Sequence, residues 1–197
     1  MRIGIIGGGI IGLSSAYYLN KAGYEVTIID KGDLSDGCSH GNAGMIVPSH
    51  IIPLAAPGMI AKGIRWMFNS TSPFYVKPRL NVDLLRWGFQ FYKHANERHV
   101  QAAIPALKEL SFYSKAQYQQ LAKDLPFNFN YAERGLLMLY QTAETEHEEA
   151  ETATIANDHG VKAQILSQEE VQVLEPDVRV TARGAVYFPG DAHLTPQ

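Results

Sequence analysis

The chain has 197 residues, of which 46% are hydrophobic and 19% are charged, and its formal net charge is −3. This is an ordinary globular composition for one or two domains, without the basic cluster that nucleic-acid binding requires. A single cysteine, Cys38, excludes an internal disulfide framework and fits a reducing, cytoplasmic compartment, and no stretch of the sequence has the length and hydropathy of a membrane span.

The first thirty residues follow the order of a dinucleotide-binding unit. Residues 1–6 are an apolar run that predicts a buried parallel strand, and residues 7–12 carry glycines with the spacing G-x-G-x-x-G. Residues 13–21 predict a helix, and residues 24–29 predict a second strand that ends on the acid Asp30. The glycine spacing also argues against reading this stretch as a secretory signal.

Each part of this unit has a physical task. Gly7 allows a sharp turn out of the strand, Gly9 lets a pyrophosphate lie against the backbone, and Gly12 lets the helix pack close to the sheet. The helix N-terminus offers free N–H groups to the phosphates. Asp30 is placed to accept hydrogen bonds from an adenosine ribose, and its charge would repel a 2′-phosphate.

Residues 31–58 are rich in glycine, serine, asparagine and proline, and they predict a long loop of the functional kind. Residues 59–68 are amphipathic, with Lys62 and Arg65 among large apolar groups. A short helix packed on its neighbours is the favoured interpretation, and contact with a membrane surface is the alternative.

The rest of the chain predicts helices and short strands without a simple β–α alternation. The expected elements are helices over 82–95, 105–123 with Pro105 in the first turn, 142–158 and from 167, and strands over 135–140, 162–166 and 184–188. Five glutamates between positions 144 and 151 are interpreted as a solvated helix face, and no metal site is predicted.

A doubly wound sheet normally needs about five or six strands, and residues 1–30 supply two. Residues 51–190 do not supply the others, and Thr195 and Pro196 have the character of a helix start. We therefore expect the sequence to be the amino-terminal part of a longer protein, whose carboxyl-terminal part is its first partner. Residues 1–197 by themselves are not expected to be a competent enzyme.

Several stretches resemble the D-amino-acid oxidase/dehydrogenase superfamily of FAD enzymes, above all its bacterial D-amino-acid dehydrogenases, with glycine and sarcosine oxidases as cousins. These stretches are the first motif with Asp30 and Lys31, residues 38–45 (CSHGNAGM), 79–91, 174–177 and 187–194. The resemblance implies an α/β fold, with a Rossmann-type FAD-binding domain that is incomplete in this chain and an inserted α+β substrate domain. Residues 1–50 would begin the FAD-binding domain, and residues 51–190 would form a portion of the substrate domain.

By resemblance, the chain holds FAD without a covalent bond, because the histidine that attaches flavin in some relatives aligns with Asn42. The implied cofactor-binding residues are Gly7, Gly8, Gly9, Ile10, Ile11, Gly12, Asp30, Lys31, Ser39, His40, Asn42, Ala43, Gly44 and Met45. Weak candidates on the substrate side are His50, Arg134 and Tyr140, and the arginine that binds the substrate carboxylate is expected beyond residue 197.

The implied reaction oxidises the Cα–N bond of an amino acid, either a D-amino acid or a cyclic secondary amine, to an imine or 2-oxo acid. The electron acceptor is a quinone or oxygen, and the protein is expected in the cytoplasm, with a peripheral position on the inner membrane as the alternative. Three other functions stay open at this point. They are a glycine- or sarcosine-type oxidase, a nicotinamide-dependent dehydrogenase and a non-enzymatic dinucleotide-binding fragment.

Overall fold

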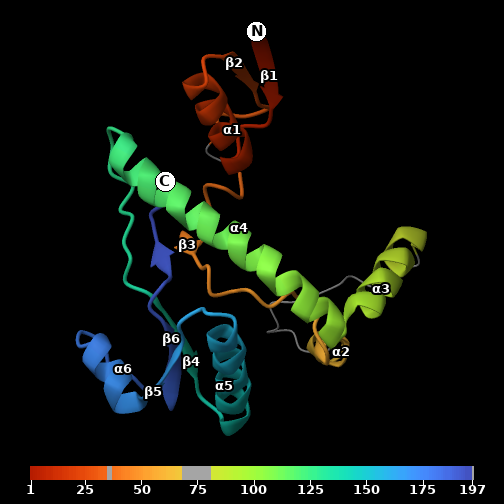
Figure 1. Ribbon diagram of the computed structural model, residues 1–197, viewed down its shortest axis with the longest axis vertical. Helices are drawn as coiled ribbons and strands as arrows, with labels where there is room; N and C mark the ends of the chain where they lie inside the picture. The colour runs from red at the N-terminus through yellow and green to blue at the C-terminus, as the bar shows by residue number, and fades with distance from the viewer. Residues whose placement is uncertain (35–36, 68–80, 197) are drawn as a thin grey trace.

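The computed structural model describes residues 1–34, 37–67 and 81–196. Figure 1 shows helices and short strands arranged around one long diagonal helix, α4. In chain order the elements are β1 (Arg2–Ile6), α1 (Ile10–Lys21), β2 (Glu25–Ile29), β3 (Met45–Ile46), α2 (Met59–Met67), α3 (Val82–His94), α4 (Glu97–Asp124), β4 (Leu136–Tyr140), α5 (Ala143–Asp158), β5 (Gln164–Ser167), α6 (Gln168–Leu174), β6 (Gly184–Phe188) and β7 (Ala192–His193).

The amino-terminal module consists of β1, α1 and β2. The two strands are parallel, and their register runs from Arg2 opposite Glu25 to Ile6 opposite Ile29, as expected of a β–α–β unit. Among the described residues, β1 and β2 pair only with each other. Ile6 at the end of β1 is 91% exposed and Ile11 on α1 is 82% exposed, so this module presents apolar surface that its own elements do not cover.

A second sheet has the strand order β4-β6-β5, and both of its pairings are antiparallel. Helices α5 and α6 pack against this sheet, as the lower part of Figure 1 shows. The core of the chain lies here and reaches up to the amino-terminal half of α4. Its buried residues are Ile51, Val100, Ile104, Tyr140, Ala153, Ala156, Val161, Val186 and Phe188.

Helix α4 has 28 residues and a length of about 42 Å, and it connects the parts of the molecule. The predicted start at Pro105 is wrong: the helix begins at Glu97, and Pro105 lies inside it. The Asn96 side chain accepts a hydrogen bond from the His99 N–H, which caps the helix eight residues earlier than Pro105 suggested. A buried contact through Ile104 holds the proline-containing turn in place.

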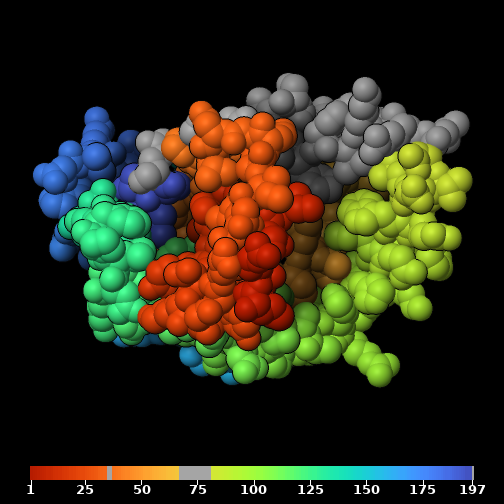
Figure 2. Space-filling model, turned by 90° about the horizontal axis from the view of Figure 1, so that it is seen from above, coloured from red at the N-terminus to blue at the C-terminus, as the bar shows by residue number. Residues whose placement is uncertain are grey.

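Two contacts hold the amino-terminal module near the end of α4. The Tyr18 hydroxyl donates to Gln117 at 2.9 Å, and the Lys21 ammonium lies 2.9 Å from the Asp124 carboxylate. Helices α2 and α3 lie at the opposite end of α4 (Figure 1). Seen from above, the red and orange amino-terminal residues occupy the middle of the face, with α3 at one side (Figure 2).

A short antiparallel pair, β3 with β7, joins the loop after the module to the end of the described chain. An isolated bridge between Ala132 and His193 extends this contact. No helix within the described ranges combines the length and the hydropathy needed to cross a membrane. The membrane-surface alternative for residues 59–68 includes Phe68, which lies outside the described residues.

Candidate functional site

The glycine turn after β1 has the geometry that the sequence predicts. Gly7 has φ +101°, in the region that favours glycine, and its N–H donates to the Ile29 carbonyl at 2.8 Å. A Cβ at Gly12 would overlap the Gly7 carbonyl oxygen, so α1 and the turn approach each other as closely as glycine allows. A Cβ at Gly9 would lie 3.1 Å from the Ser39 hydroxyl, so the turn has little free space on that side.

The Asp30 carboxylate lies against this turn. Its Oδ2 accepts a hydrogen bond from the Gly8 N–H at 2.7 Å, and its Oδ1 accepts one from the Gly32 N–H at 2.9 Å. These backbone hydrogen bonds, the Gly8 bond above all, hold the pKa of the Asp30 carboxyl below its ordinary value. The side chain is exposed and ionised at neutral pH, and it can accept further hydrogen bonds from a ligand.

The amino terminus of α1 is capped from outside its own segment. Gly9 is the N-cap residue and has no side chain to cap the helix, but the Ser39 hydroxyl accepts a hydrogen bond from the Ile10 N–H at 2.9 Å. Ser39 therefore brings the loop after β2 to the end of the helix where the dipole favours anions.

Asn42 fixes the conformation of this loop. Its side-chain amide donates to the Ser39 carbonyl at 2.6 Å, and its Oδ1 accepts from the Gly44 N–H at 2.7 Å. Gly44 has φ +65°, and a Cβ there would overlap the Leu194 carbonyl oxygen. The Leu194 N–H donates back to the Gly44 carbonyl at 2.8 Å. The asparagine–alanine–glycine sequence thus forms a turn that is locked against the end of the described chain.

A cavity of about 830 Å³ begins at the amino terminus of α1 and extends between this loop and α4. Polar residues line its α1 end, and apolar residues of α4 and the following segment line the opposite wall. The polar lining includes Ser39 and Asn42, and the apolar wall includes Tyr118, Leu121, Phe127 and Phe129.

The structure brings most of the predicted cofactor residues to one place. Gly7, Gly8, Gly9, Ile10, Gly12, Asp30, Ser39, Asn42 and Gly44 are joined by the contacts described above, and Met45 lines the cavity. The other four lie at the edge of this group. Ile11 and Lys31 are exposed, Ala43 is exposed within the turn, and His40 is half-buried in the preceding turn.

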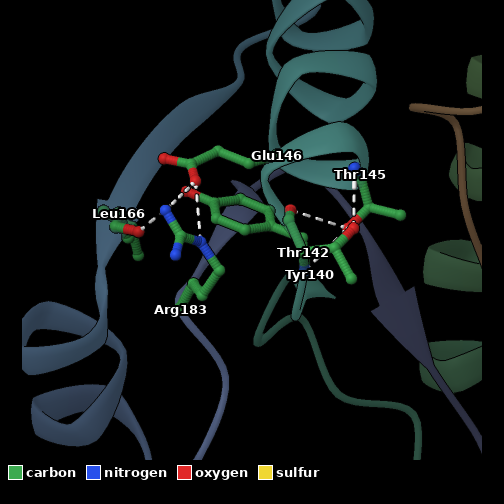
Figure 3. Close-up of polar contacts among 6 residues, drawn as sticks. All are labelled: Tyr140, Thr142, Thr145, Glu146, Leu166 and Arg183. Carbon is green, nitrogen blue, oxygen red and sulfur yellow. Dashed lines mark hydrogen bonds and ion pairs between the residues drawn. The ribbon is translucent and has the colours of Figure 1, made fainter.

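The three substrate-side candidates are not brought together, and none of them lines the large cavity. Tyr140 is 4% exposed, and its hydroxyl donates to the Leu166 carbonyl at 3.4 Å across the sheet. It lies beside the ion pair between Arg183 and Glu146, as Figure 3 shows. Arg134 is exposed, and its backbone carbonyl accepts from the Tyr187 hydroxyl at 3.0 Å.

His50 has different surroundings. Its Nδ1 lies 3.2 Å from the Ser49 hydroxyl, which in turn contacts the buried carboxylate of Asp191. Sequence reasoning missed Ser49, and it included Asp191 only within the stretch 187–194, because their contact joins positions 142 apart and has no local signature. The apolar wall on α4 was also missed, since its residues fit an ordinary amphipathic helix.

Within the described ranges, no three histidine, cysteine or acidic side chains are grouped as a metal ion requires. The expected solvated face of α5 is partly engaged in ion pairs. Glu148 contacts Lys62 of α2 at 2.6 Å, and Glu146 contacts Arg183 at 2.9 Å.

Comparison with known proteins gives a consistent result. A family model described as FAD dependent oxidoreductase (DAO) matches residues 2–197. The chain is 33% identical over 192 residues to a D-amino acid dehydrogenase of Helicobacter pylori, and 32% identical over 196 residues to D-amino acid dehydrogenase 2 of Ralstonia nicotianae. These matches cover 98% and 97% of this chain, but only 46% of each relative, so the chain spans about half the length of both.

Solved structures of other proteins share the fold of this chain. Glycine oxidase from Geobacillus kaustophilus superposes with a TM-score of 0.64 at 22% identity, over 99% of this chain and 41% of that one. An L-alpha-glycerophosphate oxidase from Mycoplasma pneumoniae, solved with FAD bound, superposes with a TM-score of 0.56 at 19% identity, over 100% of this chain and 40% of that one. The predicted Rossmann-type α/β fold is confirmed.

Proposed function

Because this chain belongs to the DAO family of FAD-dependent oxidoreductases, we propose that its protein oxidises the Cα–N bond of a D-amino acid or a cyclic secondary amine. The product is an imine, which water converts to a 2-oxo acid when the amine is primary. The single observation that carries this proposal is the joined site of the glycine turn, Asp30 and the Asn42 loop, in a chain about one-third identical to D-amino acid dehydrogenases.

The residues present fit FAD. Asp30 would accept hydrogen bonds from the adenosine ribose, and the turn at Gly8 and Gly9, at the amino terminus of α1, would hold the pyrophosphate. Ser39, which already places an oxygen at the Ile10 N–H, lies at the phosphate end of the site. FAD supplies the hydride acceptor of the reaction.

The loop residues extend the site toward the flavin ring. Asn42 and Gly44 hold the backbone in a fixed turn, and Met45 faces the cavity that begins at α1. Gly7 and Gly12 shape the turn itself, and the remaining proposed contacts are made by the four edge residues Ile11, Lys31, His40 and Ala43. A fixed turn matters because the reacting carbon has to stay within contact distance of the flavin.

Non-covalent attachment of FAD is part of the proposal, since Asn42 stands where some relatives of this family carry the flavin-attaching histidine. Membership of this family sets aside the nicotinamide-dependent alternative. A glycine- or sarcosine-type oxidase stays the second candidate, because the glycine oxidase structure shares the fold over 99% of this chain. A quinone or oxygen is the proposed electron acceptor.

The division of the chain follows from the same proposal. Residues 1–50 begin the FAD-binding domain, and residues 51–190 form a portion of the substrate domain. The separate sheets β1-β2 and β4-β6-β5 support this division, because no strand pairing joins them within the described ranges.

A cytoplasmic location with peripheral membrane contact is likewise a proposal. Of the two cationic residues on α2, Lys62 forms an ion pair with Glu148 of α5. The exposed Arg65 is then the α2 residue that we propose to contact a membrane surface.

Anaerobic titration of the purified protein tests the proposed function. The protein, expressed from its complete gene, should be yellow and should release FAD on acid precipitation. Amino acids of the right class should bleach the flavin absorbance. A colourless protein, or a flavin that no amino acid reduces, would contradict the proposal.

A further inference from the structure

The buried carboxylate of Asp191 holds Ser49, which lies shortly after the loop of residues 38–45. Asp191 lies between β6 and β7 and is 1% exposed. Its Oδ1 accepts a hydrogen bond from the Ser49 N–H at 3.1 Å, and its Oδ2 accepts one from the Ser49 hydroxyl at 2.5 Å. Ser49 is 5% exposed, so both partners are shielded from water. Each oxygen of the carboxylate is satisfied by the same residue.

The hydroxyl of Ser49 has a second neighbour, the Nδ1 atom of His50, at 3.2 Å. A serine hydroxyl has one proton, and here that proton is donated to Asp191. The oxygen of Ser49 can then only accept from His50. The Nδ1 atom must therefore carry the imidazole proton in the neutral ring, and Nε2 is left with a free lone pair.

The opposite arrangement requires a protonated Asp191. Its proton would be donated to the Ser49 oxygen, because Oδ1 already faces an N–H group, and Ser49 would then donate to His50. Burial raises the pKa of the Asp191 carboxyl above its ordinary value, and the hydrogen bonds from Ser49 lessen this rise without cancelling it. The positive charge of Lys115 on α4 also favours the ionised carboxylate.

A further acid near His50, among the described residues, is Glu149 on α5. Burial raises the pKa of Glu149, and the nearby charge of His50 lowers it. The half-buried Glu149 carboxyl does not compete with Ser49 for the Nδ1 atom of His50, because Nδ1 is directed toward the Ser49 hydroxyl.

We propose that Asp191 is a positioning residue which acts through Ser49 to hold His50 in its Nδ1–H form, so that the exposed imidazole presents Nε2 as a hydrogen-bond acceptor. The chain of contacts runs from a buried carboxylate to an exposed ring, and with Asp191 ionised each link has one proton direction. The same contacts fix the orientation of the ring, because Nδ1 contacts a hydroxyl that is itself held by the Asp191 carboxylate.

The chemical class that this acceptor fits is an amine that donates an N–H, bound on the exposed side of His50 and outside the large cavity, which His50 does not line. This step rests on the proposed function: the amino group of the substrate has to lose its proton before its Cα–N bond is oxidised. A neutral Nε2 with a fixed direction accepts a hydrogen bond from an ammonium group, and it can accept that proton. In the Nε2–H form, the ring would instead direct an N–H donor at the ammonium group, and no hydrogen bond could form.

The tautomer can be measured without any assay of activity. The protein expressed from its complete gene is labelled with ¹⁵N-histidine, and two-bond ¹H–¹⁵N correlation spectra report which ring nitrogen carries the proton. The His50 signals are assigned by their loss in His50→Gln. Above the pH at which the ring is neutral, we expect a protonated Nδ1 and an unprotonated Nε2. An unprotonated Nδ1 in the unaltered protein would overturn the proposal.

Two variants reverse the proton direction in a defined way. In Asp191→Asn the carboxamide oxygen has to face the Ser49 N–H, so its NH₂ group faces the Ser49 hydroxyl and donates to it. Ser49 then donates to His50, and the ring should change to the Nε2–H form. Ser49→Ala removes the relay and should let the ring leave the Nδ1–H form. A His50 spectrum that stays unchanged in both folded variants would overturn the proposal.

A kinetic measurement separates this proposal from the proposed function. In Asp191→Asn and Ser49→Ala, flavin reduction by a saturating amino acid should slow by roughly threefold to tenfold, with a shifted pH profile. Thr154→Ala removes an exposed hydroxyl on α5, and it should leave the rate of flavin reduction and the pH profile unchanged. If no amino acid reduces the flavin, the proposed function fails while the NMR result still decides the tautomer. Reduction with unaltered rates and pH profiles in both variants would overturn the link to the substrate amine.

Discussion

The Oδ2 atom of Asp30 accepts a hydrogen bond from the Gly8 N–H at 2.7 Å, across 22 residues of sequence. The acid at the end of β2 is therefore fixed against the turn that ends β1. One contact holds the proposed ribose acceptor and the proposed phosphate-binding turn in a defined relation before any ligand arrives. This is the preorganisation that tight binding of a long, flexible cofactor requires.

Replacing Asp30 with alanine should weaken FAD binding by roughly tenfold to a hundredfold, because a charged hydrogen-bond acceptor for the ribose is lost. Titration of the apoprotein, followed by flavin fluorescence, measures the change. Glu25→Gln is the matched control, since Glu25 is an exposed acid on the same strand, far from the turn. Equal affinities for the two variants would remove Asp30 from the site.

Replacing Gly12 with alanine should separate α1 from the turn, because the new methyl group would overlap the Gly7 carbonyl oxygen. We expect at least a tenfold loss of FAD affinity and a lower thermal transition. Gly88→Ala is the control, since Gly88 lies in helix α3 with open space around it. That change should stabilise its helix by about 0.5–1 kcal/mol and leave FAD affinity alone. Normal FAD binding by Gly12→Ala would show that the close approach is not needed.

Replacing Gly44 with alanine tests the lock between the Asn42 turn and Leu194. The substitution adds strain at φ +65° and an overlap with the Leu194 carbonyl, so the free energy of unfolding should fall by roughly 2–4 kcal/mol. Gly58→Ala shares a positive φ, +81°, but its Cβ meets nothing. It should lose only about 1–2 kcal/mol. Chemical denaturation of both variants measures the difference, and equal losses would mean that the overlap is relieved without cost.

Replacing Tyr140 with phenylalanine tests whether this buried tyrosine is structural. Its hydrogen bond to the Leu166 carbonyl is long, at 3.4 Å, and the ring stays buried in the variant. Stability should fall by about 1 kcal/mol or less, and flavin reduction should be unchanged. A large loss of flavin reduction in a folded Tyr140→Phe protein would instead place the hydroxyl at the substrate.

The parts of the fold that the sequence predicted are local. The order of strand, glycine turn, helix, strand and acid up to Asp30 needs no distant contact. The caps at Thr142 and Ser167 are also visible in sequence, because each hydroxyl bonds a backbone N–H three residues later. The start of α4 was predicted wrongly because Pro105 suits the first turn of a helix. Here the proline is tolerated inside the helix, which a cap at Asn96 and buried contacts stabilise.

The contacts that could not be predicted are long-range. The β3–β7 pair and the Ser49–Asp191 contact join segments more than 140 residues apart, and short strands of two residues have no periodic pattern. Which residues of α4 line the cavity depends on which face of this 28-residue helix turns toward the loop of residues 38–45. That choice is made by packing, and not by the helix sequence alone.

The most direct test of the central claim is rapid anaerobic mixing of the flavin-loaded protein, expressed from its complete gene, with the D and L enantiomers of the same amino acids. We expect the D enantiomers, with D-proline among them, to bleach the flavin absorbance, and the L enantiomers to leave it unchanged. Bleaching by L enantiomers alone, or by glycine and sarcosine in preference to any D-amino acid, would contradict the assignment as a D-amino-acid dehydrogenase.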